Sequence, residues 1–278
     1  MNLTVLDAAS NLGLRPGPGG KISSVDRAPT ALRAAGLIEK LRAVDAGAVT
    51  AAAYDISEWG PGAPFNADAI GDFTIELADR VEALVSRRDP SGRTSTSLLV
   101  LGGDCSVLLG PLLALKRHGE PGLVFIDAHS DFRYENVDAA AGEELAIATG
   151  RGGHLLTDLE GRGPLLADHQ IAMIGYRDAD PAPFPQVTNA ADALDAITAD
   201  DIWVHLDVDV LDPTYMPAVD SPEPGGLTPD QLVGILRPLM HDDRVRGLDV
   251  CIYDPALDSP GAPGATLLTD LLSRVFSQ

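Results

Sequence analysis

Short hydrophobic runs alternate along the chain with stretches whose apolar residues recur at helical spacing. Buried strands are expected for the runs at 3–6, 97–101, 123–126, 170–176, 202–206 and 245–253. Amphipathic helices are expected at 31–43, 67–87, 107–116, 228–240 and 266–276. Strands that alternate with helices in this way form a mainly parallel sheet covered by helices on both faces. The pattern therefore predicts an α/β fold with three αβα layers.

The alternating pattern continues through the chain without an internal repeat or a low-complexity tract. A length of 278 residues suits one large α/β domain. No composition change marks a boundary between two domains. We therefore expect a single domain that spans residues 1–278.

Composition narrows the classes of function. Twenty Lys and Arg side chains stand against 41 Asp and Glu, which gives a net charge of −21. This charge argues against partners such as nucleic acid and anionic membranes, and no apolar run is long enough for a transmembrane helix. The two cysteines form no disulfide framework, and the first ten residues lack the features of a secretory signal. We therefore expect a reduced, cytoplasmic enzyme.

Side chains that can do chemistry follow three of the expected strands. The first cluster is Gly-Gly-Asp-Cys-Ser at 102–106, the second is Asp-Ala-His-Ser-Asp at 127–131, and the third is His-Leu-Asp-Val-Asp at 205–209. Ligands of open α/β sheets bind outside the carboxyl ends of the strands. The three clusters are therefore expected to meet at one edge of the sheet.

The spacing within these clusters indicates a metal site. Alternate residues of an extended chain share a face, which groups Asp127 with His129 and Asp131, and Asp207 with Asp209. Carboxylates this close repel one another unless protons or cations offset their charge. Two divalent cations balance four carboxylates, and ligation by carboxylates with imidazole suits manganese.

Each cluster taken alone has a simpler interpretation. An Asp-x-Asp pair after a strand is usually a solvated loop or a cap, and a lone cysteine such as Cys105 is more often a small buried hydrophobe. His205 shares the face of Asp207. It is expected to be a hydrogen-bonded core histidine, with a supporting role behind the metal ligands as the alternative.

The three clusters, in this order, resemble the motifs of the ureohydrolase family of arginases, agmatinases and formimidoylglutamases. Gly-Gly-Asp-Cys-Ser is similar to the family's Gly-Gly-Asp-His-Ser signature, and the segments 127–131 and 207–213 match its two other metal motifs. Further similar segments lie at 17–20, 28–33, 225–228 and 247–249. The resemblance covers most of the chain and implies an arginase-like fold.

The resemblance also implies a centre of two Mn²⁺ ions per chain. One ion would be bound by Cys105, Asp127, Asp131 and Asp207, and the other by Asp127, His129, Asp207 and Asp209. A hydroxide that bridges the two ions would attack the sp² carbon of a guanidino or amidino group. Asp131 would be the catalytic residue that accepts a hydrogen bond from this hydroxide. Family members are often trimers or hexamers, so a homo-oligomer is implied.

Two departures from the family pattern concern the ligands and the substrate. Cys105 stands where the family has a histidine, and a thiolate there favours zinc, iron or cobalt more than an imidazole does. A protonated Cys105 that leaves one ion weakly bound is the alternative. Ile252 stands where the family has a glutamate that pairs with the substrate guanidinium. Either Asp254 or Glu223 takes over this pairing, or the substrate is less basic than arginine.

Three loop positions also concern the substrate. Asp180, in the segment Ile-Gly-Tyr-Arg-Asp-Ala-Asp-Pro at 174–181, matches the arginase residue that contacts the α-amino group, although it can also be a turn-capping aspartate. Arg133 stands where arginases have an asparagine, and it either clamps a substrate carboxylate or is a surface charge. Ala141 lies nearest to the position of the family's proton-shuttling histidine, which has no match here.

The leading hypothesis is hydrolysis of a linear C–N bond in an arginine-like α-amino acid. Arginine would give ornithine and urea, and N-hydroxyarginine would give ornithine and hydroxyurea. A cysteine in the first motif resembles the branch of the family that acts on such hydroxylated substrates. An agmatinase, a formimidoylglutamase or a guanidino-acid hydrolase is one alternative. A catalytically decayed regulatory or assembly subunit is the other, given the changes at Cys105, Ile252 and Ala141.

Overall fold

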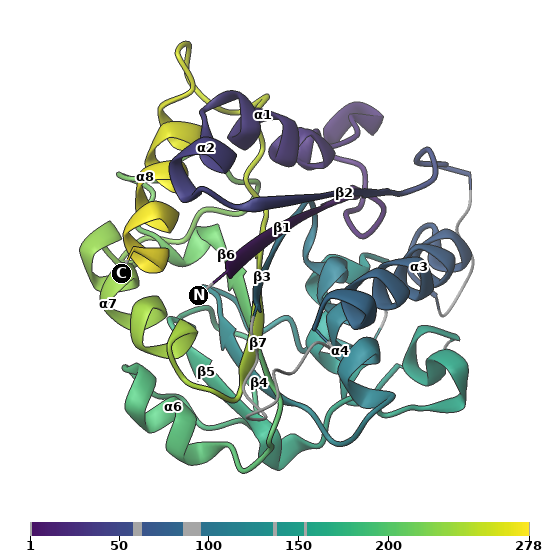
Figure 1. The fold of residues 1–278 in the computed structure, drawn as a ribbon. Helices are drawn as coiled ribbons and strands as arrows, with labels where there is room; N and C mark the ends of the chain where they lie inside the picture. Colours follow the sequence, from purple (N-terminus) through teal and green to yellow (C-terminus); the bar gives the residue numbers. More distant parts are fainter. Residues whose placement is uncertain (1, 58–62, 86–95, 136–137, 153–154, 278) are drawn as a thin grey trace.

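A seven-stranded parallel sheet forms the centre of the protein (Figure 1). The computed structural model describes residues 2–57, 63–85, 96–135, 138–152 and 155–277. The strands are β1 (Asn2–Ala9), β2 (Val44–Thr50), β3 (Thr96–Gly102), β4 (Gly122–Ile126), β5 (Ile171–Ile174), β6 (Ile202–Asp207) and β7 (Val245–Cys251). Their order in the sheet is β2-β1-β3-β7-β6-β4-β5, and every paired neighbour is parallel. The predicted α/β class and parallel sheet are confirmed.

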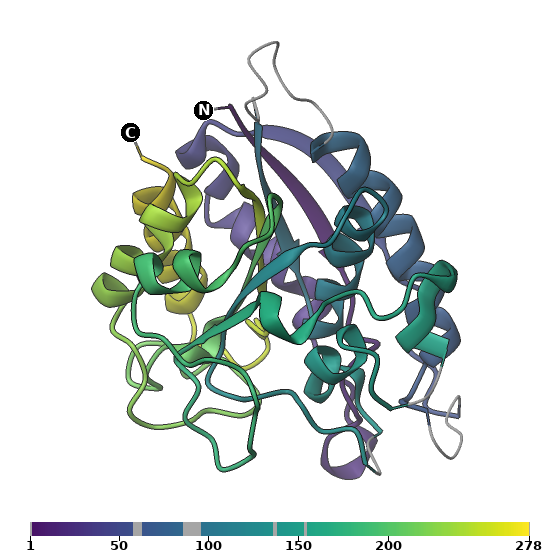
Figure 2. The ribbon, with the colours of Figure 1, turned by 90° about the horizontal axis from the view of Figure 1, so that it is seen from below.

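Helices cover both faces of this sheet, which confirms the three-layer prediction. They are α1 (Ala28–Ala34), α2 (Leu37–Leu41), α3 (Ala67–Val85), α4 (Leu109–Lys116), α5 (Glu144–Ala148), α6 (Ala190–Ala196), α7 (Pro229–Met240) and α8 (Pro263–Phe276). Helices α1, α2, α6, α7 and α8 lie on one face, and α3 and α4 lie on the other (Figures 1 and 2). Helix α5 packs beside α4. Among the described residues, no helix combines the length and hydrophobicity that a bilayer span requires.

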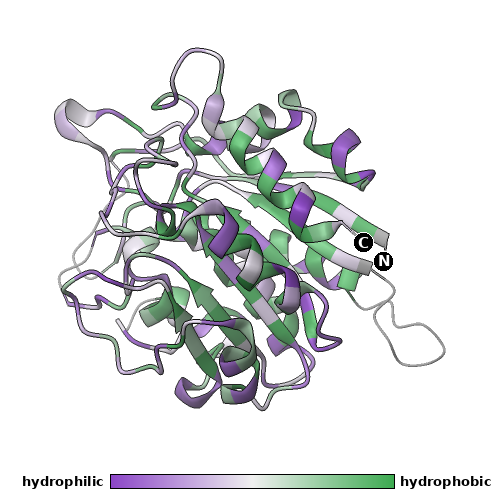
Figure 3. Cartoon of the chain, turned by 90° about the vertical axis from the view of Figure 1, so that its left-hand side faces the viewer, coloured by the Kyte–Doolittle hydropathy of each residue, from purple (hydrophilic) through white to green (hydrophobic). Residues whose placement is uncertain are grey.

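The middle of the sheet is the hydrophobic core. Every residue of β4, β5, β6 and β7 is buried, because helices exclude water from both faces of these strands. Figure 3 shows hydrophobic residues concentrated along the strands. The register of the sheet also places Phe125 of β4 beside His205 of β6, and His205 beside Asp249 of β7. This row brings two polar side chains together inside an apolar core.

Some elements differ from the sequence prediction. The helix expected at 31–43 is two helices, because Gly36 adopts a left-handed φ of 82° between α1 and α2. Strand β2 was not predicted, since its sequence VDAGAVT lacks an apolar run and, of its residues, only Val49 is buried at this sheet edge. Helices α5 and α6 were not predicted either, because elements of five and seven residues carry too little periodicity.

Candidate metal centre

The three sequence clusters lie at one edge of the sheet, as predicted. Cys105 follows β3, Asp127 follows β4, and Asp207 ends β6. Because all these strands are parallel, their carboxyl ends point to the same edge. Cys105 and Asp127 are fully buried, and Asp207 and Asp209 are nearly so. His129 is partly exposed, with 19% of its side chain accessible, so this end of the cluster faces solvent.

A buried aspartate holds the first cluster in position. Asp104 accepts hydrogen bonds at Oδ2 from Ser10 Oγ, at 2.8 Å, and from the Gly13 amide, at 3.1 Å. Its Oδ1 accepts from the Ser106 amide at 2.9 Å and so caps the short helix that begins at Cys105. A Cβ at Gly103 would lie 1.8 Å from the Ser10 carbonyl oxygen, so only glycine permits this approach. The role of Asp104 is therefore to fix Cys105 in place.

Asp127, His129 and Asp209 form a group that we call the outer group. Each of the three offers a ligand atom within 4.8 Å of the other two. His129 Nδ1 lies 2.9 Å from Asp209 Oδ2 and 3.6 Å from Asp127 Oδ1. Asp127 Oδ2 is buried and has no hydrogen-bond partner among the described residues. An unpaired buried carboxylate oxygen is costly, and a bound cation or a proton would offset this cost.

Cys105, Asp127, Glu144 and His205 form a second group, which we call the inner group. Their ligand atoms also lie within 4.8 Å of one another, and all four residues are buried. Cys105 Sγ donates to Asp207 Oδ2 over 3.1 Å. Asp127 belongs to both groups, so it could be shared by two cations. A third set of close ligand atoms comes from His205, Asp249 and Cys251.

The expected ligands Asp131 and Asp207 are not members of either group among the described residues. Both are close to them: Asp207 contacts Cys105, and the Asp131 carboxylate is one of the charges that raise the pKa of Asp127. Asp131 has a left-handed φ of 42°, and its carbonyl oxygen accepts from the Leu145 amide of α5 at 3.2 Å. Such strain at a non-glycine residue is typical of functional sites.

Burial and mutual repulsion control the protonation of the cluster. Burial raises the pKa values of Cys105, Asp127 and Asp207 well above their ordinary values, and neighbouring carboxylates add to the effect. Burial alone would lower the pKa of His129, but hydrogen bonds to Asp127 and Asp209 raise it to about 11. Protons thus offset the negative charge when no cation does, and the donor set fits a pair of divalent cations.

Glu144 and His205 are potential ligands that sequence analysis did not assign. Glu144 is fully buried, and burial, the Asp131 charge and a hydrogen bond between the Glu144 and Asp131 side chains raise its pKa. No sequence signal marks Glu144, because the path of the loop brings it to the site. His205 did carry a signal, since it shares a strand face with Asp207. The interpretation of His205 as a satisfied core histidine is only half confirmed, because Nε2 has no partner.

Two of the predicted substrate residues face each other. Arg133 Nε lies 3.4 Å from Asp180 Oδ2, and both side chains are roughly half exposed, at 60% and 47%. Arg133 lies two residues after Asp131, and Asp180 lies in the loop after β5. A cation and an anion this close match the two charges of an amino acid, whose carboxylate and ammonium lie on one carbon.

The other predicted substrate positions lie around the same edge. Asp254 is buried. Its Oδ2 accepts a hydrogen bond from Ser23 Oγ at 3.1 Å, which holds the N-terminal loop in place. Its Oδ1 accepts a hydrogen bond from the Ala256 amide at 2.8 Å. Glu223 is half-buried. Ile252 is buried with a left-handed φ of 72°, a strained conformation for a β-branched residue. A substrate role for Asp254 or Glu223 remains a prediction.

One arginine holds the surrounding loops together. The guanidinium of Arg177 donates hydrogen bonds to five backbone carbonyl oxygens, those of Gly175, Asp209, Val210, Glu223 and Pro224, at 2.8–3.3 Å. These carbonyls belong to the loops after β5 and β6 and to the segment before α7. Arg177 lies in the segment 174–181, and no pattern in the sequence predicts these hydrogen bonds.

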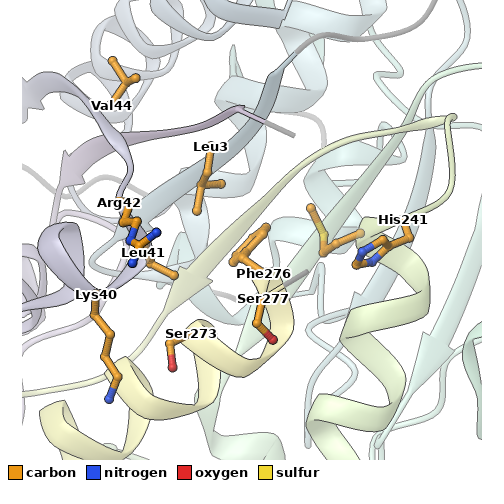
Figure 4. Close-up of a pocket in the computed structure, with 10 residues that line it drawn as sticks. Leu3, Lys40, Leu41, Arg42, Val44, His241, Ser273, Phe276 and Ser277 are labelled. Carbon is orange, nitrogen blue, oxygen red and sulfur yellow. The ribbon is translucent and has the colours of Figure 1, made fainter.

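A separate cavity of about 510 Å³ lies at the opposite end of the strands. It is lined by Leu3 at the start of β1, by Arg42 before β2, and by Phe276 and Ser277 at the end of α8 (Figure 4). The amino ends of the strands meet here, whereas the outer and inner groups lie at the carboxyl ends. This cavity is therefore not the site of the chemistry.

Comparison with known proteins agrees with this geometry. A family model described as the arginase family matches residues 17–277. An arginase of Bacillus caldovelox is 29% identical over 285 residues, covering 91% of this chain and 93% of the relative. An arginase of Staphylococcus aureus (strain MRSA252) is also 29% identical, covering 84% and 85%. The solved structure of the B. caldovelox arginase has a TM-score of 0.85 and covers 100% of this chain and 98% of its own, which shows the shared fold.

Proposed function

Because this chain belongs to the arginase family, we propose that it is a binuclear metal-dependent amidinohydrolase. The observation that carries this proposal is the sharing of Asp127 between two adjacent groups of ligand atoms, one of which is wholly buried and one partly open. Two separate but adjoining groups support two cations better than one. The proposed ions are Mn²⁺, with another divalent metal favoured at the inner group because Cys105 is a soft ligand.

The residues have distinct roles in the proposed reaction. Cys105, Asp127, Asp131, His129, Asp207 and Asp209 would hold the two ions. When bound, the ions lower the pKa of a water molecule and so provide a nucleophile at neutral pH. Asp131 accepts a hydrogen bond from the attacking water and orients it toward the substrate carbon. Water adds to this carbon, the C–N bond to the product amine breaks, and the amine leaves with a proton.

An arginine-like α-amino acid is the proposed substrate. The facing pair of Arg133 and Asp180 supports this class, because Arg133 can pair with an α-carboxylate and Asp180 with an α-ammonium. A decarboxylated amine such as agmatine has no carboxylate for Arg133. The buried Ile252 offers no charge to a guanidinium, which favours N-hydroxyarginine, with ornithine and hydroxyurea as products, over arginine, with ornithine and urea.

A substrate panel tests this proposal. Metal-loaded protein is assayed with N-hydroxyarginine, arginine, agmatine, formimidoylglutamate and guanidino acids, and ornithine and urea-type products are measured. We expect N-hydroxyarginine or arginine to give the highest kcat/KM. Turnover of agmatine or formimidoylglutamate alone would establish the corresponding alternative. No turnover of any compound by protein that carries both ions would favour the decayed subunit.

The cellular setting is proposed from the chemistry of the chain. Both Cys105 and Cys251 are free and buried, which suits a reducing cytoplasm. We also propose a single domain and a homo-oligomer, a trimer or hexamer as is common in the family. Light scattering of the purified protein measures the number of chains in the assembly.

A further inference from the structure

His205 is positioned as metal-binding histidines are. It is fully buried on β6, and its ring stacks on Phe125 with centroids 4.9 Å apart and planes 19° apart. Nδ1 lies 2.6 Å from Asp249 Oδ2. Nε2 has no hydrogen-bond partner among the described residues. A metal-binding histidine almost always donates a hydrogen bond from its second ring nitrogen to a carboxylate, a backbone carbonyl or water.

The neighbours of Asp249 fix which nitrogen of His205 is free. Trp203 Nε1, which can only donate, lies 2.6 Å from Asp249 Oδ1, and Cys251 Sγ donates to Oδ2 over 3.3 Å. Asp249 therefore acts as an acceptor toward its neighbours, and the Nδ1 of His205 carries the proton. His205 contributes one ring nitrogen to the inner group, and Nε2 is the ring nitrogen that has no partner among the described residues.

The ligand atoms of the inner group are nearly close enough together to bind one ion. Its ligand atoms, from Cys105, Asp127, Glu144 and His205, all lie within 4.8 Å of one another. Two ligands on opposite sides of an ion such as Zn²⁺, at bond lengths of about 2.0–2.3 Å, would be roughly 4.6 Å apart at most. The Glu144 carboxyl group is paired with Asp131, one of the expected ligands of the same ion. Asp127 Oδ2 and His205 Nε2 are thus unpaired buried polar atoms of this group, and Cys105 adds a thiol to it.

We infer that His205 and Glu144 are direct ligands of the inner ion. His205 supplies the imidazole that position 105 lacks, and Glu144 supplies an additional carboxylate. The inner ion would then have sulfur, nitrogen and oxygen ligands, a mixture that suits zinc, cobalt or iron better than manganese. The inference deepens the proposed function and rests on it, because it concerns the composition of the same metal centre.

A pair of substitutions separates metal binding by His205 from its bond to Asp249. The amide nitrogen of His205→Asn can replace Nδ1 and still donate to Asp249, but the variant has no atom at the Nε2 position. His205→Gln places an amide group near the Nε2 position and loses the bond to Asp249. His118→Asn is the matched control, since His118 is an exposed partner of Glu82 far from the site. Circular dichroism verifies that each variant folds.

The readout is metal binding and not turnover. Metal content is measured by elemental analysis, and affinity is measured by chelator competition with Zn²⁺ and with Co²⁺. We expect His205→Asn to lower the affinity for the inner ion. The loss should exceed the roughly 10- to 100-fold decrease that follows removal of a residue bonded only to a ligand. His118→Asn should bind both ions as the wild type does. Wild-type affinity for both ions in His205→Asn would overturn the inference.

A measurement on the wild-type protein covers the case in which the variants do not fold. Zinc X-ray absorption at one Zn²⁺ per chain should show sulfur and imidazole bound to the same ion. Sulfur without imidazole, or no sulfur at all, would overturn the inference. Failure of the proposed function gives a different result, since wild-type protein would carry sulfur and imidazole on the inner ion but hydrolyse no amidine.

Discussion

The guanidinium of Arg133 lies against the carboxylate of Asp180, with Nε and Oδ2 3.4 Å apart. Sequence reasoning assigned the two residues separately, one to a substrate carboxylate and the other to a substrate ammonium. Their contact means that each charge is balanced by the other, so an amino acid can insert between them with no net gain or loss of charge. This geometry links the substrate class to two side chains that can be replaced individually.

Asp180→Ala should weaken the hydrolysis of α-amino acid substrates. Loss of a hydrogen bond between charged groups costs about 1.5–3 kcal/mol, so kcat/KM should fall roughly 10- to 150-fold. A guanidino acid without an α-ammonium group gives the comparison substrate, because it offers Asp180 no partner. The control is Asp200→Ala, an exposed residue before β6 at the opposite edge of the sheet. Unchanged kinetics on arginine and N-hydroxyarginine would remove the assignment of Asp180.

Cys105→His should shift metal preference toward manganese and keep the fold. An imidazole is a harder ligand than a thiolate, so the ratio of Mn²⁺ to Zn²⁺ affinity should rise. Chelator competition with each metal measures this ratio. His118→Asn is the control, because His118 is exposed and contacts Glu82 away from the site. If Cys105→His has the same metal content and the same Mn²⁺ and Zn²⁺ affinities as the wild type, Cys105 is not a ligand.

Chelator-treated protein should lose stability as the pH rises. Burial raises the pKa values of Cys105, Asp127 and Asp207, and hydrogen bonds to carboxylates raise that of His129 to about 11. The folded metal-free state therefore binds more protons than the unfolded chain, so its stability falls as the pH rises toward these raised values. If the folded state binds one more proton than the unfolded chain, the free energy of unfolding falls by about 4 kcal/mol over three pH units.

The corresponding measurement is Tm at pH 5 and pH 8, with chelator and with Mn²⁺. Divalent ions replace the protons, so the stabilisation by metal should be larger at pH 8. Equal Tm values at the two pH values in chelator would contradict the charge argument.

Arg177→Lys should destabilise the loops around the site by about 1.5–3 kcal/mol. A lysine ammonium has three donors and cannot bond to all five of these carbonyl oxygens. Urea unfolding measures the change. Arg162→Lys is the control, since Arg162 makes an exposed contact with Glu160, and its effect should stay within about 0.5 kcal/mol. A change in Arg177→Lys no larger than that of the control would contradict the bracing role.

Much of the fold and part of the site could be predicted because both depend on local pattern. Apolar runs predicted six of the strands, and parallel strands bring residues such as Cys105, Asp127 and Asp207 to one edge whatever the details of packing. Strand β2 could not be predicted, because it is held at the sheet edge by pairing with β1 and not by burial of its own side chains.

The unpredicted parts of the site depend on contacts that are distant in sequence. Glu144 reaches the inner group because the loop after Asp131 folds back, with the Asp131 carbonyl bonded to α5. The free Nε2 of His205 depends on Asp249, which lies 44 residues away. Spacing along one strand indicates which residues share a face, but not which hydrogen bonds a neighbouring strand satisfies.

The central claim is that two cations share Asp127, and metal content tests it most directly. Elemental analysis of purified wild-type protein and of Asp127→Ala, each loaded with divalent metal and freed of excess, gives the number of ions per chain. We predict about two ions for the wild type and a loss of both ions together with activity in Asp127→Ala, because this carboxylate belongs to both ligand groups. An Asp127→Ala variant that remains active and loaded with metal would contradict the account.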